Sequence, residues 1–70
     1  MMVEVFKTNI TDLKRAEQLC ETLTKHYPQS RINFDLEDSD NILRVEDQAI
    51  DVHHIVALLT NMGYVCAIIE

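Results

Sequence analysis

The 70-residue sequence contains one glycine, one proline and no tryptophan. It has no glycine-rich loop that could cradle a phosphate, and no Ser-His-Asp or Cys-His arrangement of the kind used in nucleophilic catalysis. So short a chain makes one domain, residues 1–70, with a thin core that leaves little scope for a cleft. We therefore expect a protein that is not an enzyme and that carries no cofactor.

Long apolar runs and paired cysteines are also lacking. The longest apolar runs are too short to cross a bilayer, and Met1 to Glu4 do not resemble the start of a signal peptide. Cys20 and Cys66 are far apart and stand in no C-x-x-C pattern, so they predict neither a disulfide framework nor a thiolate metal site. We expect a cytoplasmic protein without membrane insertion, in which both cysteines act as small, inert core residues.

Positive charge is scarce in the second half of the chain. Residues 1–31 carry five Lys or Arg and four acids, a net charge of +1. Residues 32–70 carry one Arg and eight acids, a net charge of −7, so the whole chain has −6. Nothing here forms the basic face that nucleic acid requires, so we expect no nucleic-acid partner. The acidic half instead suits a basic protein partner.

Hydrophobic periodicity predicts six elements. Period-two alternation or apolar, β-branched runs indicate strands over 2–8, 31–37, 42–46 and 64–69. A first helix begins after a cap at Thr11 or Asp12 and ends near His26, before Pro28; a second begins after Asp51 and stops at Gly63. Their expected apolar faces are Leu13, Ala16, Leu19, Cys20, Leu23 and Tyr27 in the first, and Val52, Ile55, Val56, Leu58, Leu59 and Met62 in the second.

The order βαββαβ predicts a ferredoxin-like two-layer α+β sandwich. Right-handed crossovers would place both helices on one face of a four-stranded antiparallel sheet with strand order 4-1-3-2. The parity of the first and last strands stays open, because either Val3 and Val5 or Met2 and Phe6 could face the core. A row on the uncovered sheet face would suit a protein interface or a homodimer, and its candidates are Val3, Val5, Val65, Ala67 and Ile69.

The whole chain resembles the heavy-metal-associated domains, the small fold of copper chaperones. The segments that carry the resemblance are Arg15-Ala16-x-x-Leu19-x-x-x-Leu23, Phe34-Asp35-Leu36-Glu37 and Ile55-x-x-Leu58-Leu59-x-x-Met62-Gly63-Tyr64. The family binds metal through M-x-C-x-x-C in the loop after the first strand. In that register this chain reads Ile10-Thr11-Asp12-Leu13-Lys14-Arg15, so both cysteines are replaced.

The positions that correspond to the family's metal loop are Ile10, Asp12, Arg15 and Tyr64. A carboxylate is a hard ligand and a guanidinium has no lone pair to give, so Asp12 and Arg15 cannot replace the thiolates that select Cu(I). Ile10 would be a packing position, and Asp12 and Arg15 could form a weak exposed ion pair. The resemblance thus implies the scaffold of the family without its thiolate metal transfer.

Other metal patterns are weak. His53 and His54 are adjacent on a helix and point about a hundred degrees apart, so they cannot converge on one metal. The acidic run from Asp35 to Glu46 resembles a calcium loop but has Asp40 where the loop needs glycine. We expect a binding module with an unidentified protein partner or a second copy of itself; the alternative is a metal-ion binding protein with ligands among Asp12, His26, His53, His54 or a cysteine.

Overall fold

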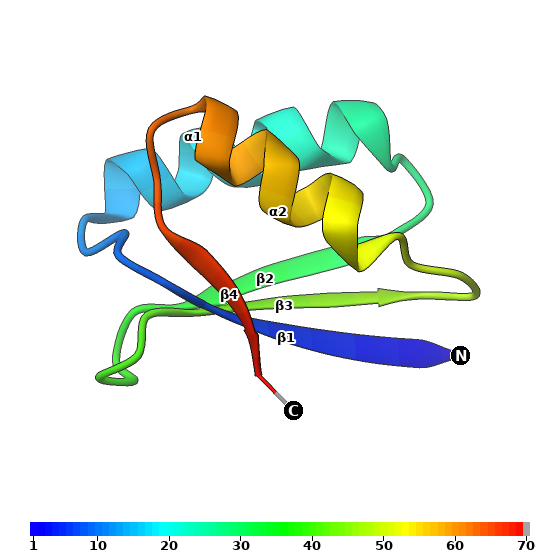
Figure 1. Ribbon diagram of the computed structural model, residues 1–70, viewed down its shortest axis with the longest axis horizontal. Helices are drawn as coiled ribbons and strands as arrows, with labels where there is room; N and C mark the ends of the chain where they lie inside the picture. The colour runs from blue at the N-terminus through cyan, green and yellow to red at the C-terminus, as the bar shows by residue number, and fades with distance from the viewer. Residues whose placement is uncertain (70) are drawn as a thin grey trace.

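The predicted order of elements is confirmed in the computed structural model, which describes residues 1–69. Four strands pair antiparallel in the order β2-β3-β1-β4, which is the predicted order read from the other edge. Figure 1 shows both helices lying over one face of this sheet. The elements are β1 (Met2–Thr8), α1 (Leu13–His26), β2 (Arg31–Asp35), β3 (Ile42–Asp47), α2 (Val52–Asn61) and β4 (Cys66–Ile69). Within residues 1–69, neither helix has the length and apolar character needed to cross a bilayer.

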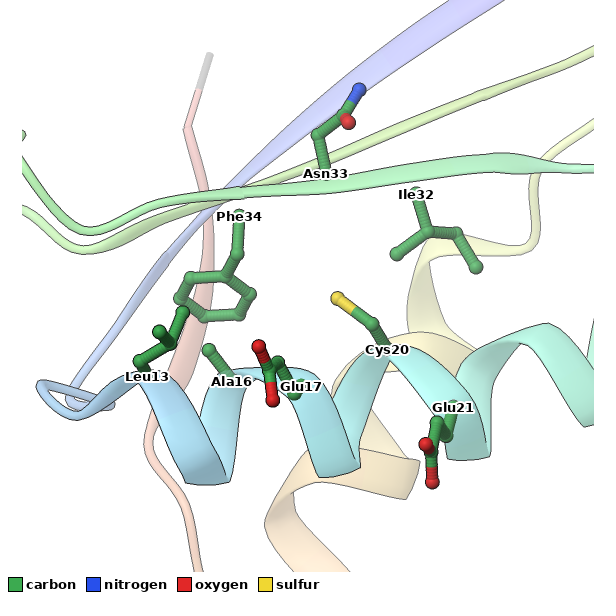
Figure 2. A pocket seen from close by; sticks show the side chains of 8 residues that line it. All are labelled: Leu13, Ala16, Glu17, Cys20, Glu21, Ile32, Asn33 and Phe34. Atoms are coloured by element: carbon green, nitrogen blue, oxygen red, sulfur yellow. The ribbon is translucent and has the colours of Figure 1, made fainter.

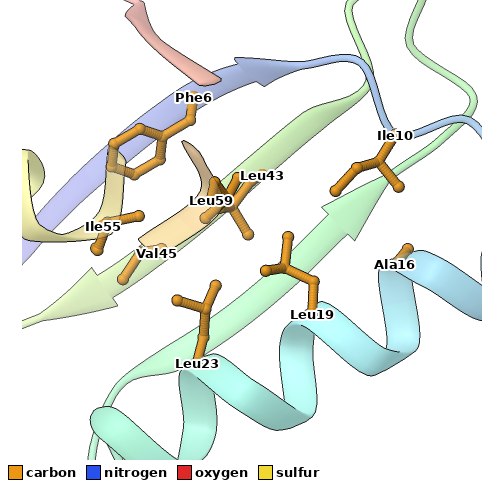
Figure 3. Close-up of a cluster of buried hydrophobic side chains, with 9 residues drawn as sticks. All are labelled: Phe6, Ile10, Ala16, Leu19, Leu23, Leu43, Val45, Ile55 and Leu59. Carbon is orange, nitrogen blue, oxygen red and sulfur yellow. The ribbon is translucent and has the colours of Figure 1, made fainter. Parts of the chain in front are cut away.

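The core lies between the two helices and the sheet (Figure 3). Leu19 and Leu23 project from α1 and Ile55 and Leu59 from α2, and all four side chains are buried. Burying each such side chain contributes about 1.5–3 kcal/mol. The cluster comprises Phe6, Ile10, Ala16, Leu19, Leu23, Leu43, Val45, Ile55 and Leu59.

The register of β1 resolves the parity that the sequence left open. Phe6 pairs with Leu43 on β3 and with Ile68 on β4, and its ring is buried under the helices. Successive strand residues point to opposite faces, so Val3 and Val5 lie on the face away from the helices. We call this uncovered side the open face.

Each helix begins at the acid that its sequence suggests. The Asp12 carboxylate accepts a hydrogen bond from the Arg15 backbone N–H at 3.1 Å, and Asp51 accepts one from His54 N–H at 3.1 Å. These bonds satisfy N–H groups that have no partner inside the first turn of a helix. Of the two predicted caps of α1, the structure therefore selects Asp12.

Gly63 ends α2 as predicted. Its φ of +90° lies in the left-handed region, which glycine enters without steric cost. The Gly63 N–H donates to Thr60 O at 3.0 Å, and the Tyr64 N–H donates to Leu59 O at 3.0 Å. This pair of bonds is the Schellman arrangement that closes a helix C-terminus.

β2 ends earlier and β4 begins later than predicted. At each of these strand ends, a side-chain oxygen accepts hydrogen bonds from backbone N–H groups, which therefore do not bond to a neighbouring strand. Asp35 Oδ1 accepts from the N–H groups of Glu37 and Asp38, at 3.0 and 3.3 Å, so β2 stops at Asp35. The Val65 N–H donates to Asn9 Oδ1 at 2.9 Å, and β4 begins one residue later. Both strands are two residues shorter than the apolar pattern predicts.

Three predicted core positions are wrong or only partly right. Leu13 retains 65% of its surface exposed and Met62 retains 41%, because each lies at the end of a helix, where neighbours cover one side only. Cys20 is half-buried at the side of α1. Leu13 and Cys20 both line a surface groove between α1 and β2.

Candidate functional site

The loop between β1 and α1 is held by hydrogen bonds at its first residues. The hydroxyl of buried Thr8 donates to Asn41 O at 2.7 Å and accepts from the Ile10 N–H at 3.2 Å. The Ile10 side chain is buried in the core, as expected for a packing position. Its neighbour Asn9 holds the start of β4 through Val65. The loop is therefore bonded both to the β2–β3 turn at Asn41 and to the residue before β4.

Asp12 and Arg15, which stand where the resemblance would place thiols, form the expected ion pair. Arg15 Nε lies 3.7 Å from Asp12 Oδ1, and both side chains are more than half exposed. Such a pair contributes about 0–1 kcal/mol. Tyr64 is half-buried against the core. Across residues 1–69, no group of three or more His, Cys, Asp or Glu side chains is placed to hold a metal ion.

Four of the predicted interface residues, Val3, Val5, Ala67 and Ile69, lie on the open face, and Val65 precedes β4 at its margin. Val5 pairs with Ile69, and Lys7 pairs with Ala67. Val65 and Val3 are 64% and 50% exposed, and Ile69 is 39% exposed. We call Val3, Val5, Val65, Ala67 and Ile69 the apolar row.

An open groove of about 400 Å³ runs between α1 and the edge strand β2. The small core was expected to leave little scope for a cleft, and this open groove lies at the surface, beside the core. The groove is lined by Leu13, Ala16, Glu17, Cys20 and Glu21 of α1 and by Ile32, Asn33 and Phe34 of β2. We call it the α1–β2 groove.

The floor of the α1–β2 groove is apolar. Figure 2 shows Ile32 and Phe34 pointing from β2 toward α1, while Asn33 between them points away. The Cys20 sulfur points from α1 toward β2, and Leu13 lies beside the Phe34 ring at one end. Between Leu13 and Glu21, α1 contributes the small side chains of Ala16 and Cys20 to the lining.

The polar part of the lining is acidic. Glu17 and Glu21 stand one helical turn apart on α1, and both are exposed. The eight lining residues include no Lys or Arg. The groove therefore combines apolar contact surface with negative charge.

The two cysteine thiols remain protonated near neutral pH. Burial raises the pKa of Cys20, and the nearby Glu17 carboxylate raises it further. Burial raises the pKa of Cys66 from 9.0 to about 11. Because the thiolate is the nucleophile and the metal ligand, both residues are poorly suited to either role.

The structure separates the two adjacent histidines. His53 is exposed on α2, whereas the Tyr27 hydroxyl forms a hydrogen bond with His54 Nδ1. His26, at the end of α1, lies with its ring centre 6.0 Å from that of His54. The sequence named His26 and His54 among several possible ligands of a metal ion, but it could not place their rings side by side or include Tyr27, because the two histidines are distant in the chain.

Searches of protein-family models, of curated proteins and of solved structures find no match to this chain.

Proposed function

We propose that this chain is a small, non-enzymatic protein-binding module whose α1–β2 groove takes a peptide segment of a partner protein. The proposed ligand segment has apolar side chains that enter the groove and Lys or Arg side chains beside them. The observation that carries the proposal is the coincidence of an apolar floor with two exposed carboxylates in one groove.

Apolar contact in the α1–β2 groove would contribute to the affinity for the ligand segment. Leu13 is among the most exposed large apolar side chains of the described chain, and it stands at the groove beside Phe34. Burial of apolar surface is worth about 25 cal/mol per Å², so covering Leu13, Ile32 and Phe34 would contribute to affinity. β2 also forms an edge of the sheet, and edge strands offer backbone N–H and C=O groups to an extended ligand.

The negative charge of Glu17 and Glu21 would attract the basic side chains of the ligand segment. Glu17 and Glu21 are neighbours on α1, and like charges at this spacing repel each other slightly. A cationic side chain that binds between them relieves this repulsion as well as gaining its own attraction. Such charge complementarity favours a basic partner and increases its association rate more than its final affinity.

The scaffold of the module fits the ferredoxin-like sandwich that the sequence predicts, and we propose a relationship to the heavy-metal-associated domains. The βαββαβ order and the strand order support this relationship, as does the burial of Ile10. In the proposed register, Asp12 and Arg15 stand where the family has its thiols, and here they form a helix cap and an ion pair instead. In this proposal the chain keeps the scaffold and has lost thiolate metal transfer.

The proposal is tested by selecting ligands from a random peptide library displayed on phage, with the whole chain as bait. We expect the enriched peptides to contain two or more apolar residues together with Lys or Arg. A fluorescently labelled consensus peptide is then titrated with the wild type and with variants. Leu13→Ala should weaken binding about fivefold to tenfold, since a buried leucine side chain contributes about 1.5–3 kcal/mol and this one is only partly enclosed.

Matched charge variants make this experiment specific. Glu17→Gln combined with Glu21→Gln should weaken binding and remove most of its salt dependence. Glu37→Gln combined with Asp38→Asn removes two exposed charges from the β2–β3 hairpin instead, and should leave the affinity within about twofold of wild type. Enriched peptides without basic residues, or equal losses in the two double variants, would overturn the proposal.

Self-association through the apolar row is the second candidate function. The observation that favours it is the exposure of Val3, Val65 and Ile69 on the open face or at its margin. In a homodimer, sedimentation velocity should show an increasing weight-average mass over the concentration series, and Val3→Lys should abolish the increase. A constant monomer mass at the highest concentration would exclude this candidate.

A further inference from the structure

The C-terminal end of α1 and the first turn of α2 bring together three aromatic side chains that the groove does not use. The ring centres of His26 and His54 are 6.0 Å apart, with the ring planes at 89°. The ring centres of Tyr27 and His54 are 5.7 Å apart, and the Tyr27 hydroxyl forms its hydrogen bond with His54 Nδ1. Both histidines are exposed, so an ion can reach them from solvent.

We propose that His26 and His54 form a two-histidine site for a divalent transition-metal ion such as Cu²⁺, Ni²⁺ or Zn²⁺, with Tyr27 as the residue that orients His54. This inference goes beyond the proposed binding of a peptide and does not depend on it.

The spacing of the two rings suits a shared ion. Zn–N bonds are about 2.0–2.1 Å long, so two imidazoles on one tetrahedral ion have ring centres about 5 Å apart. The observed separation of 6.0 Å is about 1 Å longer than this value, and both side chains are exposed. Imidazole is a favourable ligand for copper, nickel and zinc, and a poor one for Mg²⁺ and Ca²⁺.

Tyr27 supplies the outer support that metal-binding histidines usually have. With Nδ1 of His54 bonded to the phenol, Nε2 is the nitrogen available to the ion. A phenol can both donate and accept, so the bond persists when Nε2 binds metal and Nδ1–H becomes the donor. Such partners fix the ring orientation, and their loss commonly weakens metal binding 10–100-fold.

Negative charge lies beside the cluster. The Asp51 carboxylate accepts the backbone N–H of His54 at 3.1 Å, which holds its charge close to that residue. Asp51 is held there as the cap of α2. Its charge attracts a cation to the cluster. The two histidines leave coordination positions for water or for a ligand from another molecule, so the site is an open one.

The test is a titration of the whole chain, without a polyhistidine tag, with Ni²⁺ and Zn²⁺ salts, followed by calorimetry and by NMR of the histidine side chains. We expect one equivalent to bind. His26→Gln and His54→Gln should each weaken binding at least tenfold, and Tyr27→Phe about tenfold. His53→Gln is the matched control, because His53 is an exposed histidine adjacent to His54, and it should bind within about twofold of wild type.

Three outcomes would overturn the inference. One is the absence of binding at a tenfold excess of either ion. Another is an equal loss of affinity in His53→Gln and His54→Gln, which would indicate surface histidines acting separately. The third is displacement of the bound ion by millimolar Ca²⁺, which would place it on carboxylates. Because His26 and His54 are exposed, we expect their variants to keep the circular dichroism spectrum and melting temperature of the wild type.

Discussion

Placing two thiols in the β1–α1 loop tests the proposed relationship of the scaffold to the heavy-metal-associated domains. The double variant Asp12→Cys/Arg15→Cys places cysteines at the two positions that would hold them in the proposed M-x-C-x-x-C register. Asp12 is the N-cap of α1 and its carboxylate reaches the Arg15 backbone N–H at 3.1 Å, so thiolates at the two positions start close enough to share one soft ion. We expect the variant to bind one Cu⁺ per chain.

The cost in stability follows from the interactions that Asp12 makes. Its carboxylate accepts the Arg15 N–H at 3.1 Å, and losing such a cap costs about 0.5–2 kcal/mol. The exposed ion pair at 3.7 Å adds about 0–1 kcal/mol. A chain of this length has a free energy of unfolding of about 4–10 kcal/mol, so the variant should remain mostly folded. A urea titration followed by circular dichroism measures this loss.

Copper binding is assayed anaerobically by competition with a chromophoric Cu⁺ chelator. The wild type should lose all its copper to the chelator, because both native thiols are half-buried and burial raises the pKa of each. Asp12→Ser/Arg15→Ser is the control, since serine retains the cap but adds no thiol. If the cysteine variant is folded and gives up Cu⁺ as readily as the serine control, the loop lacks the geometry that the resemblance implies.

Three further predictions concern stability. Leu19→Ala should cost about 2–5 kcal/mol because it leaves a cavity in the core, whereas Leu13→Ala at the groove should cost much less; equal midpoints in urea would contradict the assignment of core and surface. Gly63→Ala should lower the free energy of unfolding in urea by about 1–2 kcal/mol, because a residue with a side chain is strained at φ +90° although nothing lies within 4 Å of the added Cβ. Gly63→Asn should lower it less, since asparagine tolerates this conformation better. The Ser30 hydroxyl lowers the pKa of Asp47, so the folded chain binds protons less readily than the unfolded chain and loses stability as the pH falls through that lowered pKa. Ser30→Ala should make this loss of stability at acid pH less steep, as measured by thermal melts over a pH series. An unchanged slope would refute the assignment.

The sequence predicted the order of the elements because each strand and helix has its own periodicity and its own end signal. Asp51 and Gly63 bound α2 in the structure as in the sequence, since a cap and a left-handed turn depend on neighbours only a few residues away. The strand ends were less accurate. β4 begins late because Asn9, far away in the chain, takes the Val65 N–H, and no local pattern contains that partner.

The candidate site could be predicted only in part for the same reason. The apolar row follows from strand parity, which the register with β3 decided. The α1–β2 groove depends on how closely α1 approaches the edge strand, and this distance reflects the packing of the whole core. Leu13 was assigned to the core because it continues the helical period, yet it lies at the groove with most of its surface exposed.

The central claim, that the α1–β2 groove is a peptide-binding site, is tested most directly by an amide NMR titration of the labelled chain with the selected consensus peptide. The account predicts that the largest shifts fall on Leu13, Cys20 and Phe34, at the groove, while Val5 and Ile69 on the open face stay unchanged. Largest shifts on the open face, with the groove amides unmoved, would contradict it.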